Sequence, residues 1–452
     1  MTNVLSIAGL IIIGVLLFEL IIFFHEGGHY LTAKRSGIKV NEFALGMGPK
    51  IFSFTKGETT YSLRLLPIGG YCSMEGEDED SDNSRAFNNA KIWKRMIVII
   101  AGAVMNMVLG IILMFVIVVQ QPAYSSLTVD DFQVNSFSAN SGLQAGDQII
   151  RLNNYNIWNS RDLSYAIGTM KVQEVDGHSI KIYKEDCTNE LTILYQTLTN
   201  DEKNTLTEAQ VKYLYNVITE GCKKINQAES KEDAYKLMSD TYTQMNNQIG
   251  ISKFTVPEIE EKDTRQRYVT DITVIRNGEQ TELKDVDFFT YRNPETDAPS
   301  IAIDFYVKPI EKTFTSVISE TFGQTVSVIR MTWSSLAGLV TGQFGIQDIS
   351  GPVGITSAIS QVASAGLERS FMEAVNNIIL VMVIITINLG IVNMLPFPAL
   401  DGGRFVLLLI EGIFKKPIPR KVESYINAAG LVILLLFMVL VSVKDIWQLV
   451  GG

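Results

Sequence analysis

Four long apolar runs dominate the pattern of this chain, two toward each end, while the residues between them mix polar and apolar positions as water-soluble proteins do. A helix that crosses a bilayer needs about 20 mostly apolar residues. The runs Val4–Phe24, Met96–Val119 and Ala374–Leu395 reach this length, and Gly430–Val443 approaches it when extended back to about Asn427. The pattern therefore predicts four transmembrane helices.

Basic residues predict how these helices are oriented, because loops enriched in lysine and arginine stay in the cytosol. They gather in the first and the last loop between the apolar runs: Lys34, Arg35, Lys39, Lys91, Lys94 and Arg95, then Lys415, Lys416, Arg420 and Lys421. We therefore expect residues 31–95 to be cytosolic, and residues 120–373 and both termini to lie outside. Four spans and this charge distribution agree with one another.

These features divide the chain into seven parts. They are a first transmembrane helix (1–30), a cytosolic loop (31–95), a second helix (96–119), an extracytosolic domain (123–310) with an insertion at about 171–267, an amphipathic outer-face segment (311–373), a third helix with an irregular end (374–412) and a fourth helix (427–445). A fifth span within residues 311–345 remains the alternative for the amphipathic segment.

Within the cytosolic loop, the alternation changes to that of strands. Ile51–Phe54 and Thr59–Leu65 flank a turn at Lys56–Glu58, which predicts a β-hairpin. An open strand edge of such a hairpin can accept an extended peptide by β-augmentation.

Composition adds limits to this picture. The 452 residues are 47% hydrophobic, and their net charge of −10 argues against nucleic acid as a partner, since phosphate binding needs a basic surface. The three cysteines, Cys72, Cys187 and Cys222, lack the spacing of a cysteine zinc site. We expect Cys187 and Cys222 to form a disulfide on the oxidising side, and Cys72 to stay reduced.

The candidate chemistry begins with the motif HEGGH at residues 25–29, at the cytosolic end of the first apolar run. Residues four apart share a helix face, so His25 and His29 can bind one metal ion, and Glu26 beside them fits a general base. Ionisable groups at membrane depth are costly and usually functional. The alternative is a pair of interfacial histidines that contact lipid headgroups.

A hydrolytic zinc site needs a third protein ligand. Asp401 is the candidate, in the stretch NMLPFPALDGG at residues 393–403, which ends the third apolar run on the same side as His25. Its prolines and glycines break the helix, and irregular backbone at that depth is tolerated only inside protein or beside a cavity. A turn aspartate that caps a helix is the alternative.

Together, HExxH and the pattern N-x-x-P-x-P-x-x-D-G resemble the site-2 protease family (peptidase M50-like), and more narrowly its bacterial regulator of sigma-E protease type. The resemblance implies that Zn²⁺ is held by His25, His29 and Asp401, with Glu26 as general base. It also implies a catalytic role for Asn393 near the substrate backbone, where an amide can hydrogen-bond the unwound peptide. A structural role for Asn393 is the alternative.

Further stretches support the resemblance. Residues 42–50 and 64–71 are similar to the family's membrane-associated β-loop, and residues 350–355 to its segment before the third span. One departure is Ala103, which stands where the family pattern has proline. Residues 138–154 resemble a PDZ domain, with Asn159 or Ser160 capping the next helix and a hairpin turn at Asn277-Gly278. Helical spacing marks Val211–Ile218 and Lys231–Gln248 in the insertion, whose role is open.

The fold class expected is a polytopic α-helical membrane protein with four transmembrane helices, a cytosolic membrane-associated β-hairpin and an extracytosolic α+β PDZ domain carrying a helical insertion. Its expected function is intramembrane zinc proteolysis in the bacterial plasma membrane. The active site would lie near the cytosolic face. Substrates in the bilayer would be single-span proteins, such as anti-sigma factors or remnant signal peptides after a first extracytosolic cut.

Two other classes of function compete with proteolysis. A catalytically inactive scaffold that binds partners through its PDZ domain is disfavoured by the intact HEGGH and Asp401, and a transporter by the few spans and the lack of inverted repeats. The Glu19 side chain could either orient a metal ligand or pair with a polar group between the spans. His178 is expected on the surface. The PDZ domain is expected to gate untrimmed substrates, with capture of a trimmed carboxyl end as the alternative.

Overall fold

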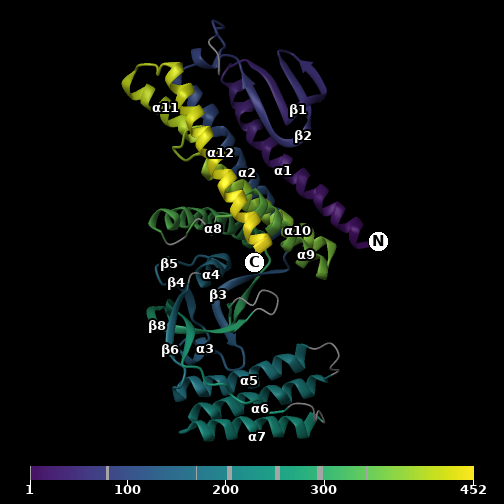
Figure 1. The fold of residues 1–452 in the computed structure, drawn as a ribbon, viewed down its shortest axis with the longest axis vertical. Helices are drawn as coiled ribbons and strands as arrows, with labels where there is room; N and C mark the ends of the chain where they lie inside the picture. Colours follow the sequence, from purple (N-terminus) through teal and green to yellow (C-terminus); the bar gives the residue numbers. More distant parts are fainter. Residues whose placement is uncertain are drawn as a thin grey trace. The chain divides into compact units, whose positions relative to one another are not determined.

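The computed structural model describes residues 2–77, 81–168, 170–200, 206–249, 255–292, 299–342, 345, 347 and 349–451. The chain forms two compact units. We call Met1–Pro122 together with Lys312–Gly452 the helical unit, and Ala123–Glu311 the central unit. Figure 1 labels most of their elements.

Four helices of the helical unit are long and apolar enough to cross a membrane, in agreement with the four apolar helices expected from the sequence. They are α1 (Thr2–Arg35), α2 (Ile92–Val118), α10 (Phe371–Asn393) and α12 (Arg420–Gly451). Each continues into polar residues beyond its apolar run. Along α12 the apolar side chains are largely exposed, as a lipid-facing surface requires.

Helix α2 packs against both α1 and α10 through small residues. A side chain at Gly28 of α1 would meet the carbonyl oxygen of Ala101, and one at Gly110 of α2 would meet Ile387. One at Gly390 of α10 would meet Met107 and the Ala103 carbonyl. Small residues at these positions let the three backbones approach closely, as in other membrane helix pairs.

The third span is interrupted, and does not continue to residue 412 as one element. Helix α10 ends at Asn393, residues 394–400 are irregular, and α11 runs from Asp401 to Phe414. The physical reason is that Pro396 and Pro398 have no backbone N–H and disfavour helical conformation before them. Close contact between Pro398 and Gly430 of α12 holds the irregular segment in place.

The predicted hairpin is confirmed as β1 (Val40–Lys56) and β2 (Thr59–Met74), which turn at Gly57 with a φ of +67°. It folds back on itself, so that residues 42–45 pair with residues 60–63 on one side and with residues 70–73 on the other. The end of β2 therefore forms an edge of this sheet. A short 3₁₀ turn, η1 (Phe87–Asn89), follows before α2.

Two more helices complete the helical unit. Helix α8 (Phe314–Thr341) begins with a capping box at Thr313, and α9 (Pro352–Arg369) begins within the stretch of residues 350–355. Asp445 of α12 is buried and accepts hydrogen bonds from the backbone N–H groups of Gly351 (2.9 Å) and Gly354 (2.7 Å). Helix α8 is not among the four candidate spans found in the described residues.

The central unit contains an eight-stranded sheet with the order β10-β3-β4-β7-β8-β9, in which β5 pairs with β4 and β6 with β7. Its strands are β3 (Ala123–Phe132), β4 (Gln148–Leu152), β5 (Tyr155–Asn156), β6 (Lys171–Asp176), β7 (Thr264–Arg276), β8 (Glu279–Arg292), β9 (Pro299–Ala302) and β10 (Phe305–Glu311). Its own helices are α3 (Phe137–Asn140) and α4 (Ser160–Ile167).

Two local predictions for the central unit are confirmed. The Asn159 side chain caps α4 by accepting hydrogen bonds from the N–H groups of Arg161 and Asp162. Asn277 and Gly278 form the β7–β8 turn with φ angles of +53° and +86°, the two positive values that a tight hairpin turn requires.

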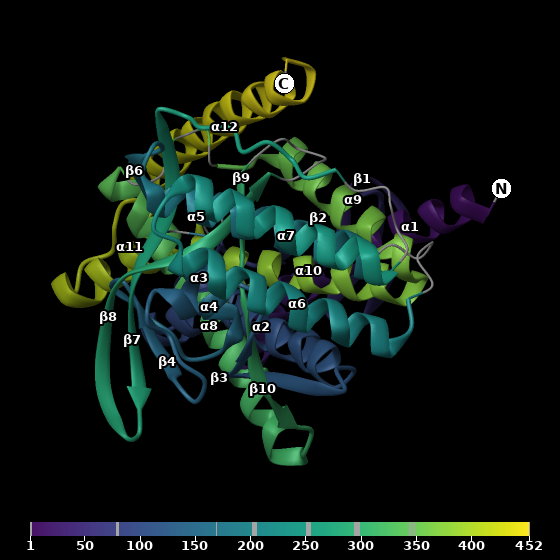
Figure 2. The ribbon, with the colours of Figure 1, turned by 90° about the horizontal axis from the view of Figure 1, so that it is seen from below.

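The insertion consists of three helices that lie side by side (Figure 2). They are α5 (Ile180–Asn200), α6 (Glu208–Gln227) and α7 (Lys231–Ile249), which confirms the predicted helical segments. The insertion is shorter than expected at both ends. Residues 171–176 form β6, which pairs with β7 from Thr264 onward, so both flanks belong to the sheet.

The predicted disulfide in this insertion was wrong, because all three cysteines are free. Cys187 and Cys222 are buried in the apolar core of the three helices, and the Cys222 thiol points to the carbonyl oxygen of Thr188 at 3.9 Å. Burial raises the pKa of each of these thiols to about 12, so both remain protonated. Cys72 is also a free thiol, as predicted.

Candidate active site

The later turns of α1 and the first residue of α11 bring together three side chains that could hold a metal ion. Nε2 of His25 lies 3.3 Å from Nε2 of His29, and Oδ2 of Asp401 lies 3.4 Å and 3.5 Å from these two nitrogens. The two histidines are four residues apart on one helix, so they share a face. The break before α11 places Asp401 opposite them.

These separations fit a zinc ion. Zinc bonds to histidine and carboxylate of about 2.0–2.1 Å in a tetrahedral site place neighbouring donor atoms about 3.3 Å apart. Oδ2 of Asp401 is buried and has no hydrogen-bond partner among the described residues. Such an unpaired oxygen is costly unless a ligand or an ion satisfies it. The donor set, its spacing and the unpaired oxygen thus agree with a three-ligand zinc site.

The Nδ1 atom of each imidazole lies close to a polar group of α2. Nδ1 of His29 donates to the carbonyl oxygen of Val98 in α2 at 2.8 Å when Nε2 faces a metal. Nδ1 of His25 lies 3.2 Å from the side-chain amide of Asn106, which is wholly buried in α2. Sequence reasoning missed Asn106. Its signal is a lone polar residue inside an apolar run, because Asn is rarely placed there without a partner.

Gly102 is a second residue that sequence reasoning missed. A Cβ atom at this position of α2 would overlap with Nε2 of His29 and with Cε1 of His25. The absence of a side chain therefore makes room for both imidazoles. Gly102 and Asn106 are four residues apart, so one face of α2 supports both histidines.

The three donor atoms open into a cavity of about 410 Å³ that Glu26 also lines. The edge segment Tyr71–Met74 of β2 lines it too. Gly70 allows this close approach, since a Cβ there would contact Ile22 and lie 3.5 Å from Cγ of Glu26. The cavity thus joins a carboxylate, a metal-type donor set and a strand edge.

Other predicted residues lie elsewhere. Asn393 is the last residue of α10 and is partly buried, but it is not among the residues that line the cavity. Glu19 does not line it either, and its Oε1 atom is buried without a hydrogen-bond partner in the described part of the chain. His178 has a half-exposed side chain in the central unit, which confirms the expected surface position.

Arg404 and Glu77 close one side of the cavity. The Arg404 guanidinium donates to the Glu77 carboxylate at 2.6 Å, and so connects the turn after β2 to the first turn of α11. Cys72 lines the same cavity. Burial, together with the Glu26 and Glu77 carboxylates, raises the pKa of Cys72, so its thiol stays neutral.

Comparisons with known proteins agree with this geometry. The model of Peptidase family M50 matches residues 13–437. A protein of Clostridium acetobutylicum, named as a zinc metalloprotease, is 30% identical over 436 residues, which cover 96% of this chain and 97% of that protein. Regulator of sigma-W protease RasP of Bacillus subtilis is 28% identical over 457 residues, and the match covers 96% of this chain and 97% of that protein. The chain therefore belongs to Peptidase family M50 and is a multi-pass membrane zinc metallopeptidase.

Proposed function

We propose that this peptidase cleaves single-span membrane proteins within the bilayer, with His25, His29 and Asp401 as its zinc ligands and Glu26 as its general base. The observation that carries the proposal is the cluster of three donor atoms, 3.3–3.5 Å apart, in one cavity with Glu26. His25, Glu26 and His29 lie in the second half of α1, an apolar helix long enough to span a membrane.

In this proposal each residue has one task in peptide hydrolysis. The zinc, when bound, supplies Lewis-acid chemistry that favours attack on the scissile carbonyl. Glu26 takes a proton from the attacking water and passes it to the leaving amide nitrogen, so that the C–N bond breaks without a free amide anion. The Val98 carbonyl and Asn106 are positioning residues that keep Nε2 of each histidine directed at the metal.

The edge segment Tyr71–Met74 is the proposed substrate platform. An unwound substrate helix exposes N–H and C=O groups that need new partners in an apolar environment. A strand edge beside Glu26 can supply them by adding the substrate as another strand. Asn393, at the last turn before the irregular segment, is proposed to donate a further hydrogen bond to the unwound peptide.

The hairpin is proposed to associate with the membrane at the cytosolic face. Large apolar side chains are exposed along it, and they are Met47, Ile51, Phe52, Phe54, Leu63, Leu65 and Leu66. Such a cluster is unusual on a surface that faces water alone. Embedding these side chains at the bilayer surface would place the strand edge at the depth of the cavity.

The central unit is proposed to be an extracytosolic PDZ domain that restricts access of substrates. The name regulator of sigma-W protease favours anti-sigma factors as one class of substrate, after a first cut outside the membrane. Remnant signal peptides have the same single-span form and are a second class.

The test is the position of the cut. The purified full-length chain is incubated in lipid with a trimmed single-span protein, and the products are identified by mass spectrometry. Cleavage within the apolar segment of the substrate is the expected result. Cleavage only in its soluble flanks would show that the chain is a peptidase of exposed segments, and would contradict the proposal.

A further inference from the structure

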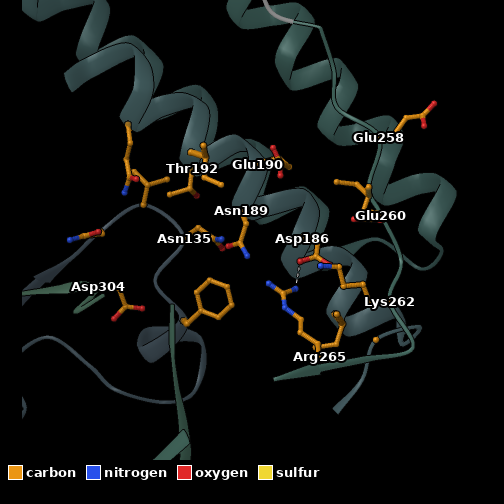
Figure 3. A pocket seen from close by; sticks show the side chains of 18 residues that line it. Asn135, Asp186, Asn189, Glu190, Thr192, Glu258, Glu260, Lys262, Arg265 and Asp304 are labelled. Atoms are coloured by element: carbon orange, nitrogen blue, oxygen red, sulfur yellow. Dashed lines mark hydrogen bonds and ion pairs between the residues drawn. The ribbon is translucent and has the colours of Figure 1, made fainter. Parts of the chain in front are cut away.

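The central unit contains a cavity of about 880 Å³ that lies outside the zinc-type cluster (Figure 3). Its walls are α5, the loop that follows β3, and the extended segment at residues 258–262. Cavities that bind ligands usually have volumes of 300–1,000 Å³. This one is therefore large enough to hold several residues of a peptide.

One face of α5 supplies most of the polar lining. Asp186, Asn189, Glu190 and Ile193 follow each other at the three- and four-residue spacing that puts side chains on one helix face. Asp186 already pairs with Arg265, as the dashed line in Figure 3 marks. The cavity therefore presents a helix face on which one carboxylate is neutralised and the other groups remain available.

Glu190 is the available carboxylate. It is partly buried and has no ion-pair partner among the described residues. Burial and the nearby Asp186 carboxylate raise its pKa. A cation that binds beside this carboxylate stabilises it, because the opposite charge offsets the free-energy cost of removing the carboxylate from water.

Two side-chain amides add unpaired hydrogen-bonding atoms. Asn189 is 6% exposed, and its Oδ1 atom is buried without a partner. Asn135 leaves a buried Nδ2 donor unpaired and adopts a left-handed φ of +55°, which Asn tolerates better than most residues. Figure 3 shows Asn189 projecting from α5 toward the loop that carries Asn135.

These unpaired atoms match the two polar groups of a peptide bond. A buried donor or acceptor without a partner costs free energy, and a ligand that pairs both would recover it. A peptide unit offers one N–H for Oδ1 of Asn189 and one C=O for Nδ2 of Asn135. Apolar side chains such as Ile193 and Ile259 line the same cavity and can contact the rest of the chain.

The charge of the residues that line the cavity indicates what charge a bound peptide should carry. Five acidic residues line the cavity, namely Asp186, Glu190, Glu258, Glu260 and Asp304, against the two basic residues Lys262 and Arg265. A cavity lined mostly by one sign of charge attracts the opposite sign. A lysine or arginine side chain is the complement to this surface.

We propose that this cavity binds an extended peptide segment with a basic side chain, whose backbone pairs with Asn135 and Asn189 and whose cation faces Glu190. The peptide-binding role belongs to the three-helix insertion together with the loop after β3. It does not depend on which bond the zinc site cleaves.

The test is direct binding to the full-length protein in detergent. The probe is an acetylated and amidated decapeptide of serine and glycine with two central lysines, and its matched control has glutamines in their place. Fluorescence anisotropy should show binding of the lysine peptide, at least about tenfold tighter than the glutamine peptide, and a loss of affinity as salt is added.

Two variants locate the site. Glu190→Gln should weaken the lysine peptide about tenfold, and Asn189→Ala should weaken both peptides without lowering the Tm, because the oxygen it removes is unpaired. Glu220→Gln is the matched control, since Glu220 is exposed on α6 and lies outside the cavity lining. Equal binding of the two peptides, or equal affinity of Glu190→Gln and Glu220→Gln, would overturn the proposal.

Zinc content and substrate cleavage are measured on the same preparations. Retained zinc and cleavage with lost peptide binding in Glu190→Gln would support the cavity as a separate site. A wild-type chain that binds no zinc would contradict the proposed active site. The peptide-binding proposal would still be decided by the comparison of Glu190→Gln with Glu220→Gln.

Discussion

The side-chain amide of Asn106 lies 3.2 Å from Nδ1 of His25, the ring nitrogen on the other side of the imidazole from the Nε2 atom that faces Asp401. With its Nδ2 atom toward His25, Asn106 leaves its Oδ1 atom buried and without a hydrogen-bond partner among the described residues. Amide oxygen and nitrogen are assigned from hydrogen bonding, so the amide can be turned to let a protonated Nδ1 donate to that oxygen. This arrangement would fix the ring and its tautomer when zinc is bound.

Replacing Asn106 with alanine should weaken zinc binding about 10- to 100-fold, the usual effect of removing a group that orients a metal ligand. Zinc affinity is measured by competition with a chelator. Asn106→Asp keeps an acceptor oxygen and should restore part of the affinity. Asn377→Ala is the control, because Asn377 bonds the Val362 carbonyl of α9 instead. Unchanged affinity in Asn106→Ala would remove Asn106 from the site.

Gly102→Ala should displace His25 and His29, because its methyl group would overlap both imidazole rings. We expect loss of most bound zinc in a protein that still folds, since alanine favours helix over glycine. Gly14→Ala in α1 is the matched control, as a Cβ there meets nothing within 4 Å. Elemental analysis of the two purified variants decides it, and equal zinc content would contradict the packing described for α2.

Much of this site could be predicted from sequence because its signals are local. The spacing of HEGGH fixes one helix face, and the prolines before Asp401 mark the helix break. Asn106 and Gly102 act through the packing of α2 on α1, and no spacing within α2 shows what they face. The double pairing of residues 42–45 was missed for the same reason, because it depends on contacts between distant segments.

The cysteine prediction shows another limit of sequence reasoning. Cys187 and Cys222 were expected to bond because of their compartment, but that argument says nothing about which way each thiol points. Their helices place both in an apolar core as free thiols. The strand at residues 171–176 was likewise assigned to the insertion, because its partner β7 lies beyond three intervening helices.

The pairing of His178 predicts a pH dependence in the central unit. Hydrogen bonds to the carboxylates of Asp263 and Glu261 raise the pKa of His178. Its folded pKa is therefore above the unfolded value of about 6.5. The stabilisation is complete below that unfolded value and is lost as pH rises through the folded pKa.

We therefore expect residues 258–263 to be held more weakly at high pH. Hydrogen exchange, corrected for its intrinsic pH dependence, should show less protection there above the folded pKa of His178. The His178→Gln variant should show no such change. Protection that rises with pH in the wild type would refute this assignment. The ion pair between Lys231 and Glu261 does not involve His178, so it is present in both proteins.

Removal of the central domain tests its role in access. Replacing residues 130–305 with a short linker deletes most of the compact unit Ala123–Glu311. If that unit is a steric gate, the variant should cleave substrates that still carry a folded outer domain. If it is a receptor for trimmed ends, the variant should cut trimmed substrate more slowly and leave untrimmed substrate intact. Cleavage assays with both substrates distinguish the two outcomes.

The most direct measurement is zinc content and substrate cleavage in the Glu26→Gln variant. Glu26 shares the cavity with the three donor atoms but is not one of them. We predict one zinc ion per chain, as in the wild type, and a rate of cleavage reduced at least about 100-fold, the usual contribution of a positioned general base. Asp401→Ala should instead lose the zinc. Cleavage by Glu26→Gln at the wild-type rate, or full zinc occupancy in Asp401→Ala, would contradict the proposed active site.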